Sequence, residues 1–244
     1  MPTLDAWGTT DAGLVRRNNE DNWVVEPELC LAVVADGMGG AACGEIASSL
    51  TVETVRSYLH HPAEDLLPEQ LLREAIREAN RQVRERARAE AACDGMASTI
   101  VAAFWYLPQV VVANVGDSRA YLWRDGRLTQ LTYDQTLANE LRRSLHLSDD
   151  EVAGYTHKNV LTMAVGSSDE VLIQVRLETL APGDRLLLCS DGLHGMVPDP
   201  TLAGMLRKNR PLRPTVEEMV EGAKAAGGED NITAVLLEWA SGTT

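Results

Sequence analysis

The feature that most restricts the fold is the way in which the strand-like segments are grouped. Short apolar or alternating segments follow one another without a helix between the members of a group. We expect strands at residues 3–10, 22–26, 30–36, 98–106, 109–115, 118–124, 127–131, 171–178, 185–190 and 231–239. Segments with helical periodicity follow one another in pairs: we expect helices at 44–60 and 68–91, and at 200–208 followed by a helix that ends at Gly227-Gly228. This order excludes strict alternation of strand and helix, and it predicts an α+β fold with antiparallel sheets.

Two short patterns predict local structure. Asp125-Gly126 lies between two strand-like segments, and this dipeptide readily takes the positive φ angles of a type I′ turn. We therefore expect a hairpin there. Thr215 with Glu218 has the spacing of a helix cap and predicts the beginning of the last helix.

Residues 134–168 differ from the rest of the chain. They are polar and suggest short helices, one of which begins with the capping-box pattern Ser148–Glu151. We expect them to form an insertion that stands off the sheets. With 244 residues, 45% of them hydrophobic, and no linker-like or repeated segment, the whole chain, 1–244, is expected to be a single domain.

The net charge of −14 limits the partners. Such a surface repels nucleic acid and anionic membranes, and no apolar run reaches the length of a membrane span. Arginines along 68–91 alternate with glutamates, so we expect a solvated, ion-paired face there and not an RNA-binding stripe. The same charge would also repel a phosphorylated substrate unless cations lie in the site.

The cysteines show no metal-binding spacing. Cys30, Cys43, Cys93 and Cys189 form no CxxC pair, and two of them lie in apolar strand-like runs. We interpret all of them as reduced residues of a cytoplasmic protein, neither zinc ligands nor disulfide partners. The absence of a basic-then-apolar leader in the first 25 residues fits this interpretation.

Acidic residues lie at the ends of several strand-like runs. LAVVA is followed by Asp36 and RLLLCS by Asp191; the others are Asp117 after VVVANVG, Asp230 before ITAVLLEW, and Glu20 and Asp21 before WVV. A buried carboxylate is costly without a cation or hydrogen-bond donors. Several of them without a His or Cys cluster indicate a hard-cation site for Mg²⁺ or Mn²⁺, with the Gly37 carbonyl as a neutral ligand. The alternative is that each acid merely caps a turn or helix.

The motifs around these acids carry a resemblance that spans nearly the whole chain. They are GLVRRNNED (13–21), VVADGMGG (33–40), GMAST (95–99), ANVGDSRAY (113–121), NVLTMAVG (159–166), LCSDGL (188–193) and EDNIT (229–233). In this order they resemble the metal-dependent protein phosphatases, also called protein phosphatase type 2C, in their compact bacterial form. The resemblance implies a four-layer α/β/β/α sandwich of two antiparallel sheets flanked by helix pairs, with 134–168 as a flap.

The resemblance also implies roles for the core metal residues. Asp36 would bridge two metal ions, with the Gly37 carbonyl on one of them. Asp191 and Asp230 would bind the first ion, and Glu20 would serve the second through water. These ions would be Mn²⁺ or Mg²⁺, and together they would activate a water for attack on phosphorus.

Further roles follow from the same motifs. Asp21 would lie beside the second metal, and Asp117 with Asp191 would hold a weaker third ion. Arg16 matches the arginine that grips the substrate phosphate, so the residues expected to act directly in catalysis are Arg16, Asp36 and Asp191. Asn231 is expected next to the metal ligands.

Two positions bear on the general acid. Eukaryotic relatives have a histidine where this chain has Met38, so a water would have to protonate the leaving group. His194 is an alternative acid, but a packed or solvent-facing histidine is the commoner outcome.

The resemblance implies hydrolysis of phosphoserine and phosphothreonine in proteins, in opposition to a bacterial serine/threonine kinase, by a cytoplasmic monomer. Two alternatives remain open. One is a catalytically silent relative that binds phosphoproteins or regulates a partner, and the other is a phosphatase for small molecules.

Overall fold

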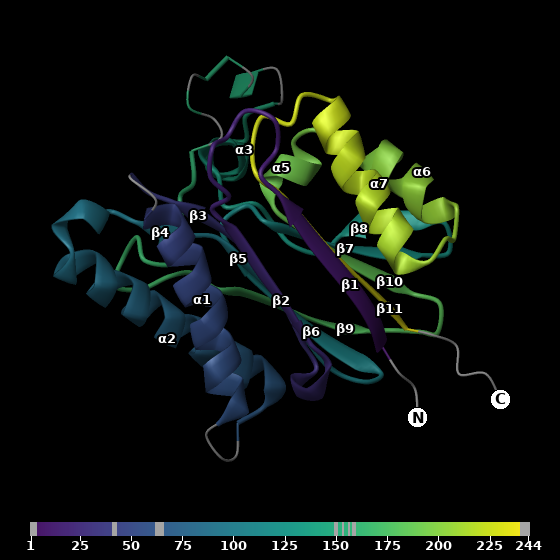
Figure 1. Cartoon of the computed structure of the whole chain (residues 1–244), viewed down its shortest axis with the longest axis horizontal. Coiled ribbons are helices and arrows are strands. Elements are labelled where there is room, and N and C mark those ends of the chain that lie inside the picture. Colours follow the sequence, from purple (N-terminus) through teal and green to yellow (C-terminus); the bar gives the residue numbers. More distant parts are fainter. Residues whose placement is uncertain are drawn as a thin grey trace.

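A computed structural model describes residues 4–40, 43–61, 66–148, 151, 152, 154, 155, 157 and 160–239. Within them, the strands form two antiparallel sheets that lie face to face (Figure 1). The first sheet has the order β1 (Leu4–Asp11), β11 (Ile232–Trp239), β10 (Arg185–Cys189), β7 (Arg119–Arg124) and β8 (Arg127–Gln130). The second has the order β2 (Asp21–Glu26), β3 (Leu31–Met38), β5 (Ile100–Tyr106), β6 (Gln109–Val115) and β9 (Gln174–Thr179), with β4 (Ala97–Ser98) paired to β3.

Helices cover the outer face of each sheet. The pair α1 (Cys43–His60) and α2 (Pro68–Ala89) packs on the six-stranded sheet, while α6 (Asp199–Arg207) and α7 (Leu212–Ala225) cover the five-stranded one (Figure 1). The short elements are the 3₁₀ turns η1 (Pro27–Leu29) and η2 (Ala91–Cys93), α5 (Asp191–His194) and α3 (Leu137–Leu145). The predicted four-layer α/β/β/α sandwich is therefore confirmed.

Strand β3 shows why its sequence is continuously apolar. Leu31, Val33 and Ala35 pack toward α1 and α2, whereas Ala32 and Val34 pack into the layer between the two sheets. Because successive side chains point to opposite faces of a strand, a strand covered on both faces needs apolar residues at every position. The run ends where the interior ends, at Asp36.

Most local predictions are confirmed. Asp125 and Gly126 have φ angles of 50° and 78° and join β7 to β8. After α7 the Gly228 amide donates to the Ala223 carbonyl at 3.1 Å, and Gly228 has a φ of 53°. The prediction for Thr215 is wrong: α7 begins at Leu212, and the Thr215 hydroxyl donates to the Pro211 carbonyl at 2.9 Å from inside the helix.

Within the segment 134–168, α3 lies above the ends of the sheets (Figure 1), but the end of the segment returns to them, because Val165 is buried in the core and forms a bridge to Ser98. The capping box is present, because the Ser148 amide donates to Glu151 Oε2 at 2.8 Å and the Glu151 amide to Ser148 Oγ at 3.4 Å. Of the helix that this box opens, residues 149, 150 and 153 lie outside the described residues.

The interpretation of the cysteines was wrong for one pair. Cys43 and Cys93 form a disulfide, with their Cα atoms 5.4 Å apart, which ties the first residue of α1 to η2. The residues are 50 positions apart, and only the packing of α1 against the end of α2 brings them together. Cys30 and Cys189 are free, and Cys189 is buried in β10.

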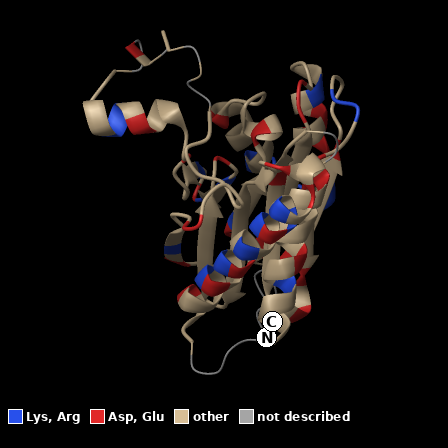
Figure 2. Cartoon of the chain, turned by 90° about the vertical axis from the view of Figure 1, so that its left-hand side faces the viewer, with Lys and Arg blue, Asp and Glu red and all other residues tan. Residues whose placement is uncertain are grey.

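Most arginines of α2 form ion pairs, as expected, whereas Arg73 donates to the Ile173 carbonyl. Arg77 pairs with Glu74, Arg81 with Glu78 and Glu85, and both Arg84 and Arg88 with Asp169. Figure 2 shows basic and acidic residues alternating along this side of the molecule. Among the described helices none is both long and apolar enough to cross a bilayer.

Candidate active site

The acids predicted from the sequence come from both sheets. Asp21 and Asp36 lie opposite each other in the register of β2 and β3, in the six-stranded sheet. Asp191 comes two residues after the end of β10 and begins α5, and Asp230 comes two residues before β11; both strands belong to the five-stranded sheet. Asp117 lies in the connection between β6 and β7, where the chain passes from one sheet to the other. One end of the sandwich thus collects carboxylates that are far apart in the sequence.

A cavity of about 320 Å³ opens between these strand ends. The residues that line it are Arg16, Glu20, Asp36, Gly37, Met38, Gly39, Thr99, Asp117, Leu161, Asp191, Asp230 and Asn231. All the predicted site residues except Asp21 are among them. No cysteine, serine or histidine lines this cavity in the described part of the chain, so these three kinds of covalent nucleophile are missing from its lining.

Asp21 lies beneath the cavity. Its Oδ2 accepts hydrogen bonds from Ser190 Oγ at 2.7 Å, just beyond β10, and from Thr233 Oγ1 at 2.6 Å, in β11, so both donors belong to the side of the five-stranded sheet. The residue is only 6% exposed. The carboxylate therefore connects the two sheets under the site, and it does not face the cavity.

Arg16 lies at the rim. Its Nη2 donates to Asp230 Oδ2 at 2.7 Å, and its side chain is 53% exposed. The charge of Asp230 raises the pKa of Arg16, so the guanidinium stays charged. A planar fork of donors that reaches both solvent and the cavity is suited to holding an oxyanion.

Asn231 fixes the loop that carries Arg16. Its Nδ2 donates to the carbonyls of Ala12 and Asn18 at 3.1 and 2.9 Å, and its Oδ1 accepts from the Glu20 amide at 2.7 Å. The asparagine next to Asp230 thus holds both ends of the loop. This supports the expectation that Asn231 acts beside the metal ligands.

Two glycines shape the side of the cavity nearest α1. A Cβ on Gly37 would lie 1.9 Å from the Gly44 carbonyl oxygen, so only glycine allows α1 to approach β3. A Cβ on Gly44 would meet Glu20 Oε2 at 2.6 Å and Gly37 O at 2.9 Å. A carboxylate oxygen of Glu20, which is expected to serve the second ion, and the Gly37 carbonyl oxygen, which is expected on one of the two ions, therefore converge on one small space that a larger residue would fill.

The acids interact strongly. Burial raises the pKa of Asp36 well above its usual value, and the charges of Asp21 and Asp191 raise it further. Burial, with a contribution from Asp191, raises the pKa of Asp117 to about 7. The pKa of Asp191 is raised by burial and by Asp230. Mutual repulsion of this kind is relieved when a cation binds between the groups.

The donor set fits hard divalent ions. Asp191 Oδ1 is buried and has no hydrogen-bond partner among the described residues. Among the described residues, no three acidic, histidine or cysteine side chains are already arranged to coordinate one ion. Asp230 pairs with Arg16, and Asp21 accepts a hydrogen bond from Ser190 on the side of the opposite sheet. Free carboxylate and carbonyl oxygens around a partly open cavity are what Mg²⁺ and Mn²⁺ require.

Thr99 and Ser118 also support the site. The Asp36 amide donates to Thr99 Oγ1 at 3.0 Å, and Thr99 Oγ1 lies 2.6 Å from Ser118 Oγ. This chain of hydrogen bonds joins the backbone of Asp36 to the residue after Asp117. Both residues lie in the GMAST and VGDSR motifs, which was the only signal in the sequence.

His194 lies outside this cavity. Its Nε2 is 3.0 Å from the carbonyl oxygen of Asp117. Burial lowers the pKa of His194 to about 4, so the ring is neutral at physiological pH. It lines a second, adjoining cavity of about 610 Å³, which also includes Asp117 and Asp191.

Comparison with known proteins agrees with this geometry. Residues 12–237 match the sequence model of the family Protein phosphatase 2C. The chain is 38% identical over 235 residues to Serine/threonine phosphatase stp of Listeria welshimeri, covering 94% of this chain and 93% of the relative.

Solved structures show the same similarity. The crystal structure of the Mycobacterium tuberculosis serine/threonine phosphatase PstP/Ppp has a TM-score of 0.89 and 32% identity, over 98% of this chain and 99% of that one. The catalytic domain of PstP in complex with two manganese ions has a TM-score of 0.86 and 33% identity, over 99% and 100% of the two chains. The chain therefore belongs to the protein phosphatase 2C family.

Proposed function

We propose that this protein is a metal-dependent serine/threonine phosphatase that hydrolyses phosphoserine and phosphothreonine in other proteins with an activated water. The observation that carries the proposal is the convergence of Asp36, Asp117, Asp191 and Asp230 on one cavity with Arg16 at its rim. The family, and a member of it that binds two manganese ions, support it.

The metal ligands are assigned from position. Asp36 would be shared by two ions, Asp191 and Asp230 would bind the first, and Glu20 with the Gly37 carbonyl would serve the second. The ions, Mn²⁺ or Mg²⁺, supply positive charge that lowers the pKa of water and stabilises the transferring phosphoryl group.

Asp117 and Asp21 would take different roles. Asp117 with Asp191 would hold a weaker third ion. For Asp21 we propose a supporting role, because its carboxylate already accepts two hydroxyl donors below the cavity.

The chain's own groups bind and orient the substrate. Arg16 would hold two phosphate oxygens, which places the phosphorus above the acids. Met38, which lines the cavity, has no proton to give, and neutral His194 faces the neighbouring cavity. The leaving serine or threonine oxygen would therefore take its proton from water in the site.

The test is turnover with two substrates. Purified protein with Mn²⁺ should hydrolyse p-nitrophenyl phosphate and a phosphothreonine peptide, and both activities should disappear with EDTA and in Asp191→Ala. Asp184→Asn is a control, since Asp184 is a buried acid at the far end of β10 that pairs with Arg124. A folded protein that binds Mn²⁺ without turnover would favour the silent regulator, and preference for small metabolites over the peptide would favour the small-molecule phosphatase.

The cellular setting is also a proposal. The substrates would be phosphoproteins of a cognate bacterial serine/threonine kinase, and the enzyme would act as a cytoplasmic monomer. The disulfide between Cys43 and Cys93 is unusual for a protein in the reducing cytoplasm. Alkylation of thiols in intact cells, followed by mass spectrometry, would show whether this pair is oxidised where the protein acts.

A further inference from the structure

A second cavity adjoins the metal cavity and leads toward α3. It has a volume of about 610 Å³ and shares Asp117 and Asp191 with the first. Arg119, Asp134 and His194 line one part of it, and Tyr133, Asn139 and Arg142 line the part near α3. A peptide whose phosphoserine occupied the metal cavity would have this space beside it.

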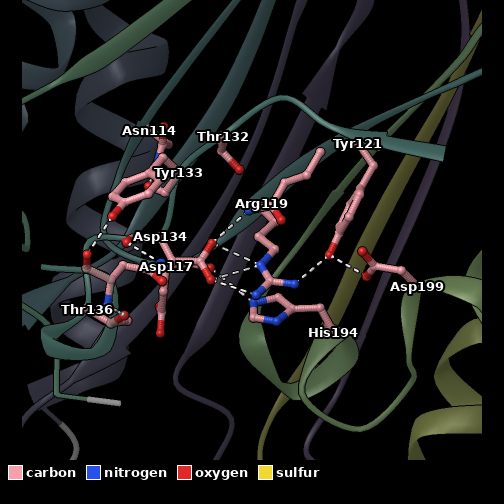
Figure 3. A network of polar contacts seen from close by, with 12 residues as sticks. Asn114, Asp117, Arg119, Tyr121, Thr132, Tyr133, Asp134, Thr136, His194 and Asp199 are labelled. Atoms are coloured by element: carbon pink, nitrogen blue, oxygen red, sulfur yellow. Dashed lines mark hydrogen bonds and ion pairs between the residues drawn. The ribbon is translucent and has the colours of Figure 1, made fainter. Parts of the chain in front are cut away.

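The ion pair of Arg119 and Asp134 lies in this cavity (Figure 3). Arg119 Nε donates to Asp134 Oδ1 and Oδ2 at 2.9 and 3.1 Å, and Nη2 donates to Oδ2 at 2.6 Å. The two side chains are only 22% and 10% exposed. A largely buried pair with this geometry holds its two backbone segments firmly, since separating it would leave an uncompensated charge.

Other contacts fix the orientation of the arginine. Arg119 Nη1 donates to Tyr121 Oη at 2.7 Å, and Tyr121 Oη donates to Asp199 Oδ1 at 3.0 Å (Figure 3). Gln130 Nε2 donates to Asp134 Oδ1 at 2.9 Å. The guanidinium is thus braced against α6, and the carboxylate against β8.

Asp134 stands at the base of the flap. Its carbonyl accepts from Asn139 Nδ2 at 2.9 Å, and Tyr133 Oη donates to the Asn139 carbonyl at 2.8 Å. Asn139 lies in the first turn of α3, whose N-cap is Thr136. These contacts couple the first turn of α3 to Tyr133 and Asp134.

Asp117 has anchors that do not involve Arg119. Its carbonyl contacts His194 Nε2, and the next residue, Ser118, contacts Thr99. Loss of the Arg119 side chain should therefore release the flap more than it disturbs the acids. The two effects can be separated by experiment.

We propose that Arg119 is a positioning residue for protein substrates. Through Asp134 it holds the base of the flap beside the metal cavity, so that the second cavity can receive the polypeptide next to the phosphorylated residue. The inference rests on the proposed phosphatase function. Its consequence is specificity, because a small phosphate ester does not reach the flap.

The experiment compares Arg119→Gln with Arg124→Gln. Arg124 lies at the other end of β7 and makes the same kind of contact, with Nε donating to Asp184 Oδ1 and Oδ2 at 2.9 and 3.1 Å. At about 3.3 Å per residue the two arginines are roughly 16 Å apart. The control therefore removes an equivalent pair from the same strand, away from the cavity.

The Arg119→Gln variant should lose about tenfold more kcat/KM on a phosphopeptide than on p-nitrophenyl phosphate, mainly through KM, which corresponds to about 1.4 kcal/mol. Amides of residues 134–145 should exchange with deuterium faster than in the parent. Arg124→Gln should change neither the substrate ratio nor the exchange of this segment. If Arg119→Gln proves unstable, Asp134→Asn should show the same two effects, and Arg119→Lys a smaller version of them.

Two outcomes would overturn the inference. Equal loss on both substrates would show that Arg119 supports the acids or the general fold. An unchanged substrate ratio in a folded Arg119→Gln protein would show that the second cavity does not contact the peptide. If the parent turns over neither substrate, the proposed function fails first, while the exchange measurement still tests the link between Arg119 and the flap.

Discussion

Reduction of the Cys43–Cys93 disulfide should destabilise the protein by several kcal/mol. The bond spans 50 residues, and closing a loop of that length removes about 14 cal/mol/K of entropy from the unfolded chain, or about 4 kcal/mol at 25 °C. For a chain of this size, 1 kcal/mol corresponds to roughly 2–4 °C in Tm, so reduction should lower Tm by about 8–16 °C.

The assay is thermal or urea unfolding in EDTA, with and without a phosphine reductant, so that metal binding does not contribute. A Cys43→Ser/Cys93→Ser variant should be insensitive to the reductant, and Cys30→Ser should behave like the parent, since Cys30 is free. Thiol titration should find two free thiols in the denatured parent before reduction and four after. Equal stability of the fully reduced and oxidised forms would refute the argument, and four free thiols at the start would refute the bond itself.

Three further predictions concern the cavity. Arg16→Ala should raise KM for p-nitrophenyl phosphate while Mn²⁺ affinity, measured by calorimetry, is retained or increases, because a positive charge next to Asp230 is removed; weaker Mn²⁺ binding would contradict the assignment. Asp36→Asn should lose more activity than Asp117→Asn, since Asp36 would serve two ions, and equal losses would contradict this ranking. The pKa values of Asp21 and Asp117 are both raised to about 7, so the folded protein holds these carboxyl groups in their protonated form. Their contribution to the stability of the metal-free fold is therefore fully present below about pH 4 and is lost as pH rises through 7. Metal-free protein should therefore be less stable to urea at pH 8 than at pH 5, and Mn²⁺ should reduce the difference; greater stability at pH 8 without metal would refute the sign.

The sequence predicted the parts of the fold that depend on local pattern. The apolar run that ends at Asp36 is a strand covered on both faces, and the hairpin at Asp125-Gly126 forms where the dipeptide indicated it. The motifs also located the cavity, since all the acids except Asp21 line it. These features were predictable because the relevant information lies within a few neighbouring residues.

The remaining features depend on contacts between distant segments. Strand β9 begins at Gln174, later than the alternating pattern from 171 suggested, because the carbonyls of Leu172 and Ile173 accept from the side chains of Gln135 and Arg73. Thr215 failed as a cap because the helix had already begun beyond Pro211. Nothing in the spacing of Cys43 and Cys93 indicated their bond.

The pairing of Arg119 with Asp134 also required the structure, since two residues of opposite charge fifteen positions apart are common in any sequence. The position of Asp21 next to Glu20 in the sequence likewise does not show that its side chain lies below the cavity. Tertiary geometry, and not residue type, decides which acids face the cavity.

The acids of the cavity are divided between the two sheets, with Asp36 on one and Asp191 and Asp230 at the ends of strands of the other. A cation bound among them would link the two sheets. The apolar layer around Val34 and Val235 sets the spacing between the sheets, and therefore the distance between the carboxylates that would bind the cation. Thinning or thickening that layer would change ion affinity from deep inside the protein, without touching a single ligand.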